Sequence, residues 1–227
     1  PDAPRQAPAR ADADRLYNSS RVPHATRWSL PLPDARTTQA DLAQQLAQTL
    51  DLLARAEPTD TGLYFHRLAL HHEDMHHEAA LYMAQALGVP VPGAQWQAPL
   101  LPGPPPALHL PAGPWRLGSN ADAGFAFDNE QGAHDLAVGA TVLDAQALRW
   151  AEYLPFVQDG GYADARWWCQ AGTTWRAQQP TASPRYLRQE GRQWQQWRHG
   201  QWRDLDLREP ACHLSHFEAQ AWCRWAG

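Results

Sequence analysis

The sequence lacks lysine and isoleucine altogether, so that all 19 of its Lys-or-Arg residues are arginines. Against 24 acidic residues, these arginines leave a formal net charge of −5, and no basic stripe runs along the chain. A nucleic-acid partner is therefore not expected, because nucleic-acid-binding domains carry clustered positive charge. We interpret the missing residue types as a compositional bias of the genome rather than as a functional feature.

Cysteines and long apolar runs are also scarce. Cys169, Cys212 and Cys223 form no close pair and leave one cysteine unmatched, which argues against a disulfide framework and for a reducing, cytoplasmic compartment. Cys212 and Cys223 are not at metal-ligand spacing, so we expect both to be buried apolar residues. No apolar run approaches the roughly 20 residues of a membrane span, and no signal peptide is recognisable. We therefore expect no membrane contact.

Tryptophan, in contrast, is abundant, and 11 of the 12 tryptophans follow residue 90. The two halves of the chain therefore differ in kind, and a proline-rich stretch separates them. We predict a helical domain over residues 1–90, a proline-rich linker over 91–112 and a second domain over 113–227. A chain of 227 residues can form two domains of modest size.

Hydrophobic periodicity and end signals predict the main elements. In the first half we expect a helix over residues 39–56, capped by Thr37 or Thr38, then a turn over 58–62 and a second helix over 65–87. In the second half we expect a strand and turn over 115–120, a helix over 145–159, a possible short helix in 166–178, short strands within 185–205, and a final helix opened by the capping box of Ser215 and Glu218.

The densest group of histidines lies in the predicted helix 65–87, where four of the chain's 11 histidines fall within seven residues. At about 100° per residue, His72 and His76 share the apolar side of this helix, one turn apart. His71 and His77 point elsewhere. Two imidazoles at i and i+4, with Cβ atoms about 5–6 Å apart, can both bind one metal ion. The alternative is a hydrogen-bond partner for each ring, because an unpaired buried imidazole is costly.

Two glutamates accompany the pair. Glu73 lies about 100° around the helix from His72 and can reach the surroundings of the metal ligands. Glu78 lies about 160° from His76, so it is not expected to bind the same ion. We expect both carboxylates to support the metal ligands rather than to bind the metal.

Residues 72–76, HEDMH, also match the H-E-x-x-H signature of zinc peptidases. In that chemistry both histidines and a third ligand hold Zn²⁺, and the glutamate is the general base for a metal-bound water. The extended form of the signature is absent, since Ala79 and Tyr82 stand in its place, and a proline-rich stretch follows instead of a second helix. A zinc hydrolase therefore stays the alternative function, and a binding module that has lost its metal is a further one.

Several separate stretches of the sequence resemble motifs of one family, and they follow one another in the same order as in that family. They are the His-x3-His-x-Glu pattern of residues 72–78, GPWRLGS at 113–119, FAFDNE at 125–130 with His134, EYLPFVQDGGY at 152–162, RWW at 166–168 and PACHLSHFEAQAWCRWAG at 210–227. Together they resemble the ergothioneine-pathway sulfoxide synthases. In that family the last stretch leads into an R-L-P-T-E-x-E-W segment, which is missing here, so we expect more of the protein downstream and also upstream.

This resemblance implies an α+β fold of two incomplete parts. The first is a DinB-like four-helix bundle that ends near residue 90. The second is a domain similar to the formylglycine-generating enzymes, with an irregular, C-type-lectin-like build. The active site would lie in the cleft between them. The oligomeric state stays open, with a monomer as the working expectation.

The resemblance further implies a mononuclear non-haem Fe(II) centre held by three histidines, of which His72 and His76 are two. The third ligand would lie upstream of Pro1, and a tyrosine proton donor would lie beyond Gly227. Such enzymes use O₂ to join the sulfur of a thiol donor to C2 of the imidazole of hercynine. A close branch uses a selenosugar and makes selenoneine. The trimethylammonium group of hercynine suits an aromatic-lined pocket.

Two departures from the family pattern bear on the donor. Many members carry glutamines between the histidines, where this chain has Asp74 and Met75. In sulfur-using relatives, arginines after the first helix bind the donor's carboxylates, and here Arg21 and Arg27 are the only arginines in that segment. We assign both to donor binding, with surface positioning as the alternative role. So few cations suit a less anionic donor, and we lean slightly towards selenium over sulfur.

Overall fold

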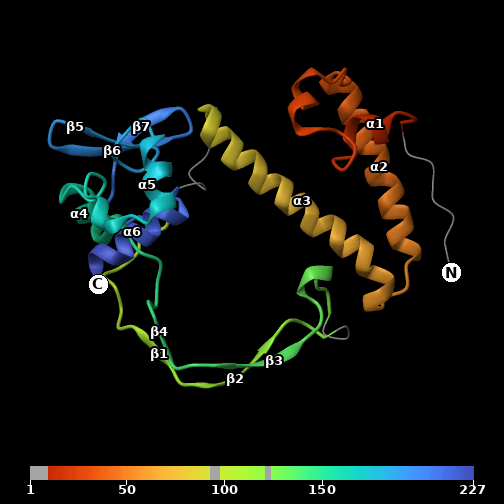
Figure 1. Cartoon of the computed structure of the whole chain (residues 1–227). Coiled ribbons are helices and arrows are strands. Elements are labelled where there is room, and N and C mark those ends of the chain that lie inside the picture. The colour runs from red at the N-terminus through yellow and green to blue at the C-terminus, as the bar shows by residue number, and fades with distance from the viewer. Residues whose placement is uncertain (1–9, 93–97, 121–123) are drawn as a thin grey trace. The chain divides into compact units, whose positions relative to one another are not determined.

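A computed structural model describes residues 10–92, 98–120 and 124–227. It is an α+β structure, with helices and three small antiparallel sheets (Figure 1). The chain divides into two compact units, residues 1–73 with 119–132 and residues 74–118 with 133–227. No helix of the described ranges is both long enough and apolar enough to span a membrane. The three-part division predicted from the sequence stays a prediction.

The first unit is mainly helical. Its longest complete helix, α2, covers Ala35–Arg55, and a turn leads from it into α3, Asp60–Leu87, which contributes residues to both units. The shorter elements of this unit are α1 (Ala13–Tyr17) and the 3-10 helices η1 (His24–Ser29) and η3 (Asp128–Glu130).

Both long helices begin earlier than the sequence predicted. Asp34, rather than Thr37 or Thr38, caps α2, because its carboxylate accepts a hydrogen bond from the Thr37 amide at 2.7 Å. The predicted turn over 58–62 already contains the first residues of α3. There the Thr59 hydroxyl accepts from the amide of Gly62 at 3.1 Å and satisfies one of the open N–H groups of that helix end. The C-terminal boundary is confirmed, since α3 ends at Leu87 and Gly88 adopts φ +69°.

The apolar stripes of the two long helices are exposed. On α2, Leu42, Leu46 and Leu50 keep 59, 59 and 54% of their surface accessible, and on α3 Phe65 keeps 76%. Apolar stripes with this spacing usually pack on other helices, and in the part of the chain described both are open to solvent. A four-helix bundle covers each stripe with its other helices, and the described residues of this unit contain no further long helix.

All strands named in the described ranges lie in the second unit, and these strands pair antiparallel. In this unit β1 (Leu108–Leu110) pairs with β4 (Thr141–Leu143), β2 (Gly113–Leu117) pairs with β3 (His134–Val138), and β5 (Leu187–Glu190), β6 (Gln193–Arg198) and β7 (Gln201–Asp204) form a meander. The short strands predicted within 185–205 are thus confirmed. Strand β1 lies inside the stretch predicted as a linker, part of which, residues 93–97, lies outside the described residues.

Three helices enclose the core of this unit. They are α4 (Trp150–Gln158), α5 (Gln170–Ala177) and α6 (His216–Ala226). Helix α4 starts five residues later than predicted, because Arg149 has an extended backbone and its amide donates to the Glu152 side chain at 3.0 Å. The buried side chains are Trp150, Tyr153, Leu154, Phe156, Tyr162, Trp168, Leu187 and Ala221.

Helix α6 confirms its predicted capping box. The Glu218 amide donates to the Ser215 hydroxyl at 3.3 Å, and the Ser215 amide donates to the Glu218 carboxyl group at 2.6 Å. The expected burial of the cysteines is wrong in one case, since Cys223 is exposed on this helix, whereas Cys212 is half-buried. An 11-residue amphipathic helix turns only one face to the core, and residue 223 lies on the other.

A buried polar contact joins α6 to the turn after α4. The Tyr162 hydroxyl donates to the Glu218 carboxyl group at 2.5 Å and lies 3.2 Å from the hydroxyl of Tyr153. Burial is the largest cause that raises the pKa of both tyrosines above the usual value, so both stay protonated. Tyr162 therefore acts as a permanent donor to Glu218, which is only 3% exposed.

We expect Tyr162→Phe to lower the free energy of unfolding by about 1–3 kcal/mol, because it leaves a buried Glu218 oxygen without its donor. Urea denaturation followed by tryptophan fluorescence measures this. Tyr17→Phe is the matched control, since Tyr17 is 51% exposed and should change stability little. Equal stability of the two variants would contradict the assigned role.

The turn after β7 contains an ion pair whose contribution to stability depends on pH. The Arg208 side chain donates two hydrogen bonds to the Asp206 carboxylate, at 3.0 and 2.7 Å, and lowers the pKa of that carboxyl group to about 2. Because this pKa is depressed in the fold, the contribution of the pair is complete above the ordinary pKa of about 3.9 and is lost as the pH falls towards 2. A ¹³C NMR titration should show this pKa, and Arg208→Gln should raise it towards the ordinary value.

Candidate functional site

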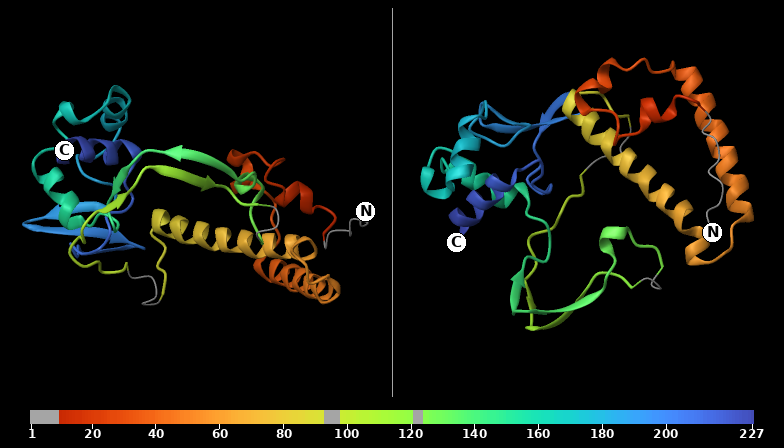
Figure 2. Two further views of the ribbon diagram at one scale, coloured as in Figure 1. Left: turned by 90° about the horizontal axis from the view of Figure 1, so that it is seen from below. Right: turned by 45° about the vertical axis from the view of Figure 1, so that its right-hand side comes forward.

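The histidine pair lies on α3, as the sequence predicted, and this helix is unbroken along its length (Figure 2). His72 and His76 are separated by one helical turn, so their side chains emerge on the same face and can converge on one ion. Both residues are exposed in the part of the chain described, and their role as metal ligands stays a prediction. Their exposure has the same reason as that of the apolar stripes, because the described residues include no helix that covers this face.

The described ranges contain no group of three or more His, Cys, Asp or Glu residues placed to hold a metal, so a metal bound to this pair would need further ligands. Helical geometry therefore fits two positions of a metal site, and the remaining positions need groups from outside the described residues. Glu73 and Glu78, also on α3, are exposed.

The neighbouring His71 belongs to an aromatic cluster that the sequence reasoning missed. Its imidazole lies 4.8 Å from the ring of Phe125 and 6.1 Å from that of Phe127, measured between ring centroids. Tyr64, about two turns earlier on α3, lies 5.4 Å from Phe125. The FAFDNE motif thus packs on the face of α3 that carries His71. The sequence contained one signal for this contact, which was that the FAFDNE motif and the histidine helix resemble the same family. No local pattern links residues so far apart in the chain.

The two arginines predicted to bind a donor lie in the first unit. Arg21 forms an ion pair with Asp14 at 3.7 Å, in which both side chains are well exposed, and such pairs contribute little to stability. Arg27 lies in the 3-10 helix η1 and is exposed. Both guanidinium groups are therefore accessible to an anionic group of a ligand.

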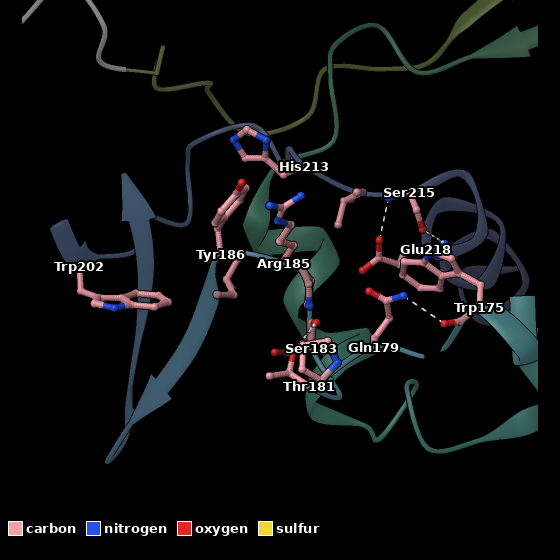
Figure 3. A pocket seen from close by; sticks show the side chains of 14 residues that line it. Trp175, Gln179, Thr181, Ser183, Arg185, Tyr186, Trp202, His213, Ser215 and Glu218 are labelled. Carbon is pink, nitrogen blue, oxygen red and sulfur yellow. Dashed lines mark hydrogen bonds between the residues drawn. The ribbon is translucent and has the colours of Figure 1, made fainter. Parts of the chain in front are cut away.

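The second unit contains a pocket of about 580 Å³ that the sequence reasoning did not find (Figure 3). Two of its residues, Tyr186 and His213, have left-handed backbones, with φ +69° and +62°, and their rings meet edge to face at 5.0 Å. The Arg185 guanidinium lies 4.6 Å from the Tyr186 ring. Burial, followed by Arg198 and Arg185, lowers the pKa of His213.

The walls of this pocket are aromatic and polar in character. Tyr186, His213 and Trp202 supply rings, and Arg185 supplies a positive charge. Strained backbones of non-glycine residues concentrate at functional positions. None of the residues predicted from the sequence to bind metal or donor lines this pocket.

No protein-family model matches this chain. Curated proteins named hercynine oxygenase are similar to it over nearly its whole length. That of Mycolicibacterium thermoresistibile is 33% identical over 223 residues, which is 94% of this chain and 48% of the relative. Those of Mycolicibacterium smegmatis and Mycobacterium tuberculosis are each 31% identical, over 95 and 93% of this chain and 50% of each relative.

The chain thus spans about half the length of the curated relatives that it matches. Its similarity to them extends through both units and includes the histidine helix and the aromatic second half. Over the part that it spans, the chain is thus similar to the hercynine oxygenases, and this similarity supports a family of the ergothioneine sulfoxide synthase type, which its motifs resemble.

Proposed function

We propose that the protein is an oxidoreductase that acts on hercynine with O₂. The observation that carries this proposal is the similarity of 31–33% identity to three hercynine oxygenases, over at least 93% of this chain. The exposed pair of histidines on α3 supports it, since oxygenases of this kind need a metal and the pair provides two nitrogen ligands on one face.

The metal of this proposal is a mononuclear non-haem Fe(II), held by His72, His76 and a third histidine from outside the described residues. An iron held by three histidines on one face would supply open positions for O₂ and substrate. Glu73, three residues before His76, would accept a hydrogen bond from that ring and fix its orientation, as carboxylates near metal-bound imidazoles commonly do. Glu78, about 160° around the helix from His76, would support the site only from outside that contact.

The reaction that we propose joins a chalcogen to C2 of the imidazole of hercynine. The donor is a selenosugar, which gives selenoneine, or a thiol, which gives an ergothioneine-type sulfoxide. The accessible Arg21 and Arg27 would bind anionic groups of the donor. The small number of cations in this segment supports the less anionic selenosugar. The H-E-x-x-H zinc hydrolase is the alternative, and the identity of the metal and the need for O₂ separate the two.

The decisive experiment loads the protein with Fe²⁺ under anaerobic conditions and then adds O₂, hercynine and either a thiol donor or a selenosugar. Mass spectrometry should detect a product that joins hercynine to sulfur or selenium, and its mass identifies the donor. Turnover with Zn²⁺ and without O₂ would instead favour the hydrolase.

His76→Gln should lower Fe²⁺ affinity and product formation by more than about a hundredfold, because loss of a direct ligand costs more than loss of its hydrogen-bonded neighbour. Metal content after dialysis and initial rates measure the two effects. The matched control is His109→Gln, since His109 is an exposed histidine of β1. A His76→Gln protein that retains iron and activity would exclude the pair as the metal site.

Arg27→Ala should raise the KM for the donor about tenfold, the cost of one charge-assisted hydrogen bond, and should leave the KM for hercynine unchanged. Steady-state kinetics with each substrate varied in turn measure this. Arg36→Ala removes an exposed arginine of α2 as the control. An unchanged donor KM would show that Arg27 positions the surface and does not bind the donor.

A further inference from the structure

The C-terminal end of α3 is fixed to the turn between β6 and β7 by one side chain. Gln85, 4% exposed, is the buried residue of this helix. Its amide nitrogen donates to the carbonyl oxygen of Trp197 at 2.9 Å, and its amide oxygen accepts from the backbone N–H of His199 at 2.9 Å. All these residues belong to the second unit, where the end of α3 and the β6–β7 turn lie side by side (Figures 1 and 2).

We call this contact between the end of α3 and the β6–β7 turn the joint. Its two segments approach so closely that Gly88 and Gly200 leave no room for a side chain. A Cβ atom on Gly200 would lie 2.5 Å from the carbonyl oxygen of Gly88, and a Cβ atom on Gly88 would lie 3.0 Å from Cζ2 of Trp197. Both glycines also have positive φ, +89° and +69°. The helix end and the turn therefore fit in one arrangement, which the amide of Gln85 holds by a bond at each of its ends.

A glutamine does more here than an apolar residue of the same size would do. Burial of an amide is favourable only when both its donor and its acceptor are satisfied. The two bonds of Gln85 have fixed directions, towards Trp197 and His199, so they specify how the helix is rotated about its axis. Apolar packing alone would hold the helix against the sheet without specifying that rotation.

The rotation of α3 decides where His76 points. Gln85 follows His76 by nine residues, which at 100° per residue places it about 180° around the helix. With Gln85 turned to the β6–β7 turn, His76 emerges on the opposite side of α3 and is exposed there.

We propose that Gln85 is a positioning residue: through its two bonds to the β6–β7 turn it fixes the rotation of α3, and hence the direction in which the His76 imidazole is presented. The consequence for catalysis rests on the function proposed above. The joint itself does not, because it is made of contacts within the second unit. The ligand affected would be the substrate of that function, which must approach a metal bound to α3 from one direction.

The test compares Gln85→Met with the wild-type protein. Methionine keeps the length of the side chain and the helix, and it removes both hydrogen bonds. Gln48→Met is the matched control, since Gln48 is an exposed glutamine of α2. Two measurements are made: amide hydrogen exchange without substrate, and the kinetics and Fe²⁺ affinity of the iron-loaded protein.

For Gln85→Met we expect the His199 amide to exchange about tenfold faster or more, because two net hydrogen bonds are lost. We expect kcat to fall by a larger factor than Fe²⁺ affinity, since His72 and His76 keep their relation within the helix and only their relation to groups outside it changes. A purely structural role would lower thermal stability without this separation of kcat from metal affinity. The control should match the wild type in all of these measurements.

Each other outcome has a definite meaning. Unchanged exchange at His199 would overturn the joint. Faster exchange at His199 with an unchanged kcat would confirm that Gln85 holds the turn and would overturn its role in positioning His76. If the wild-type protein does not convert hercynine at all, the proposed function fails, and the exchange result still decides whether Gln85 holds the turn.

Discussion

The helical repeat of α3 is the constraint on which the rest of this structure depends. With 3.6 residues per turn, it places His72 and His76 on one face and Gln85 nearly opposite His76. A single helix thus carries both the candidate metal ligands and the contact to the β6–β7 turn. Within the second unit, a change in the helical repeat between His76 and Gln85 would change the direction of His76 relative to that contact.

The second unit has a well-packed core that supports the contact between α3 and the β6–β7 turn. Its core is built from aromatic rings of α4 and α6 and from the buried Tyr162–Glu218 hydrogen bond. A buried acid is tolerated because the donors around it are fixed: the Tyr162 hydroxyl stays protonated, and the Ser215 amide cannot lose its proton. A sheet attached to such a core can hold a helix end in a defined rotation.

The first unit has the opposite character in the part of the chain described. The leucines of α2 and the apolar residues of α3 are largely exposed, although their spacing is that of helices that pack on others. The relatives are about twice as long as this chain. The similarity to these relatives is therefore a finding of sequence comparison, and the described helices by themselves do not form a closed bundle.

The sequence by itself determined the features that arise within a few turns of chain. These are the helix with its histidine pair, the stop at Gly88 and the Ser215–Glu218 capping box, whereas the α+β class was implied by the family resemblance. The starts of α2 and α3 were misplaced because Asp34 and Thr59 compete locally as caps with other polar residues. Tertiary structure alone decided that Gln85 meets His199 and that His71 meets Phe125. Such contacts join residues far apart in the chain, and their energy depends on how whole elements pack, which periodicity and capping cannot express.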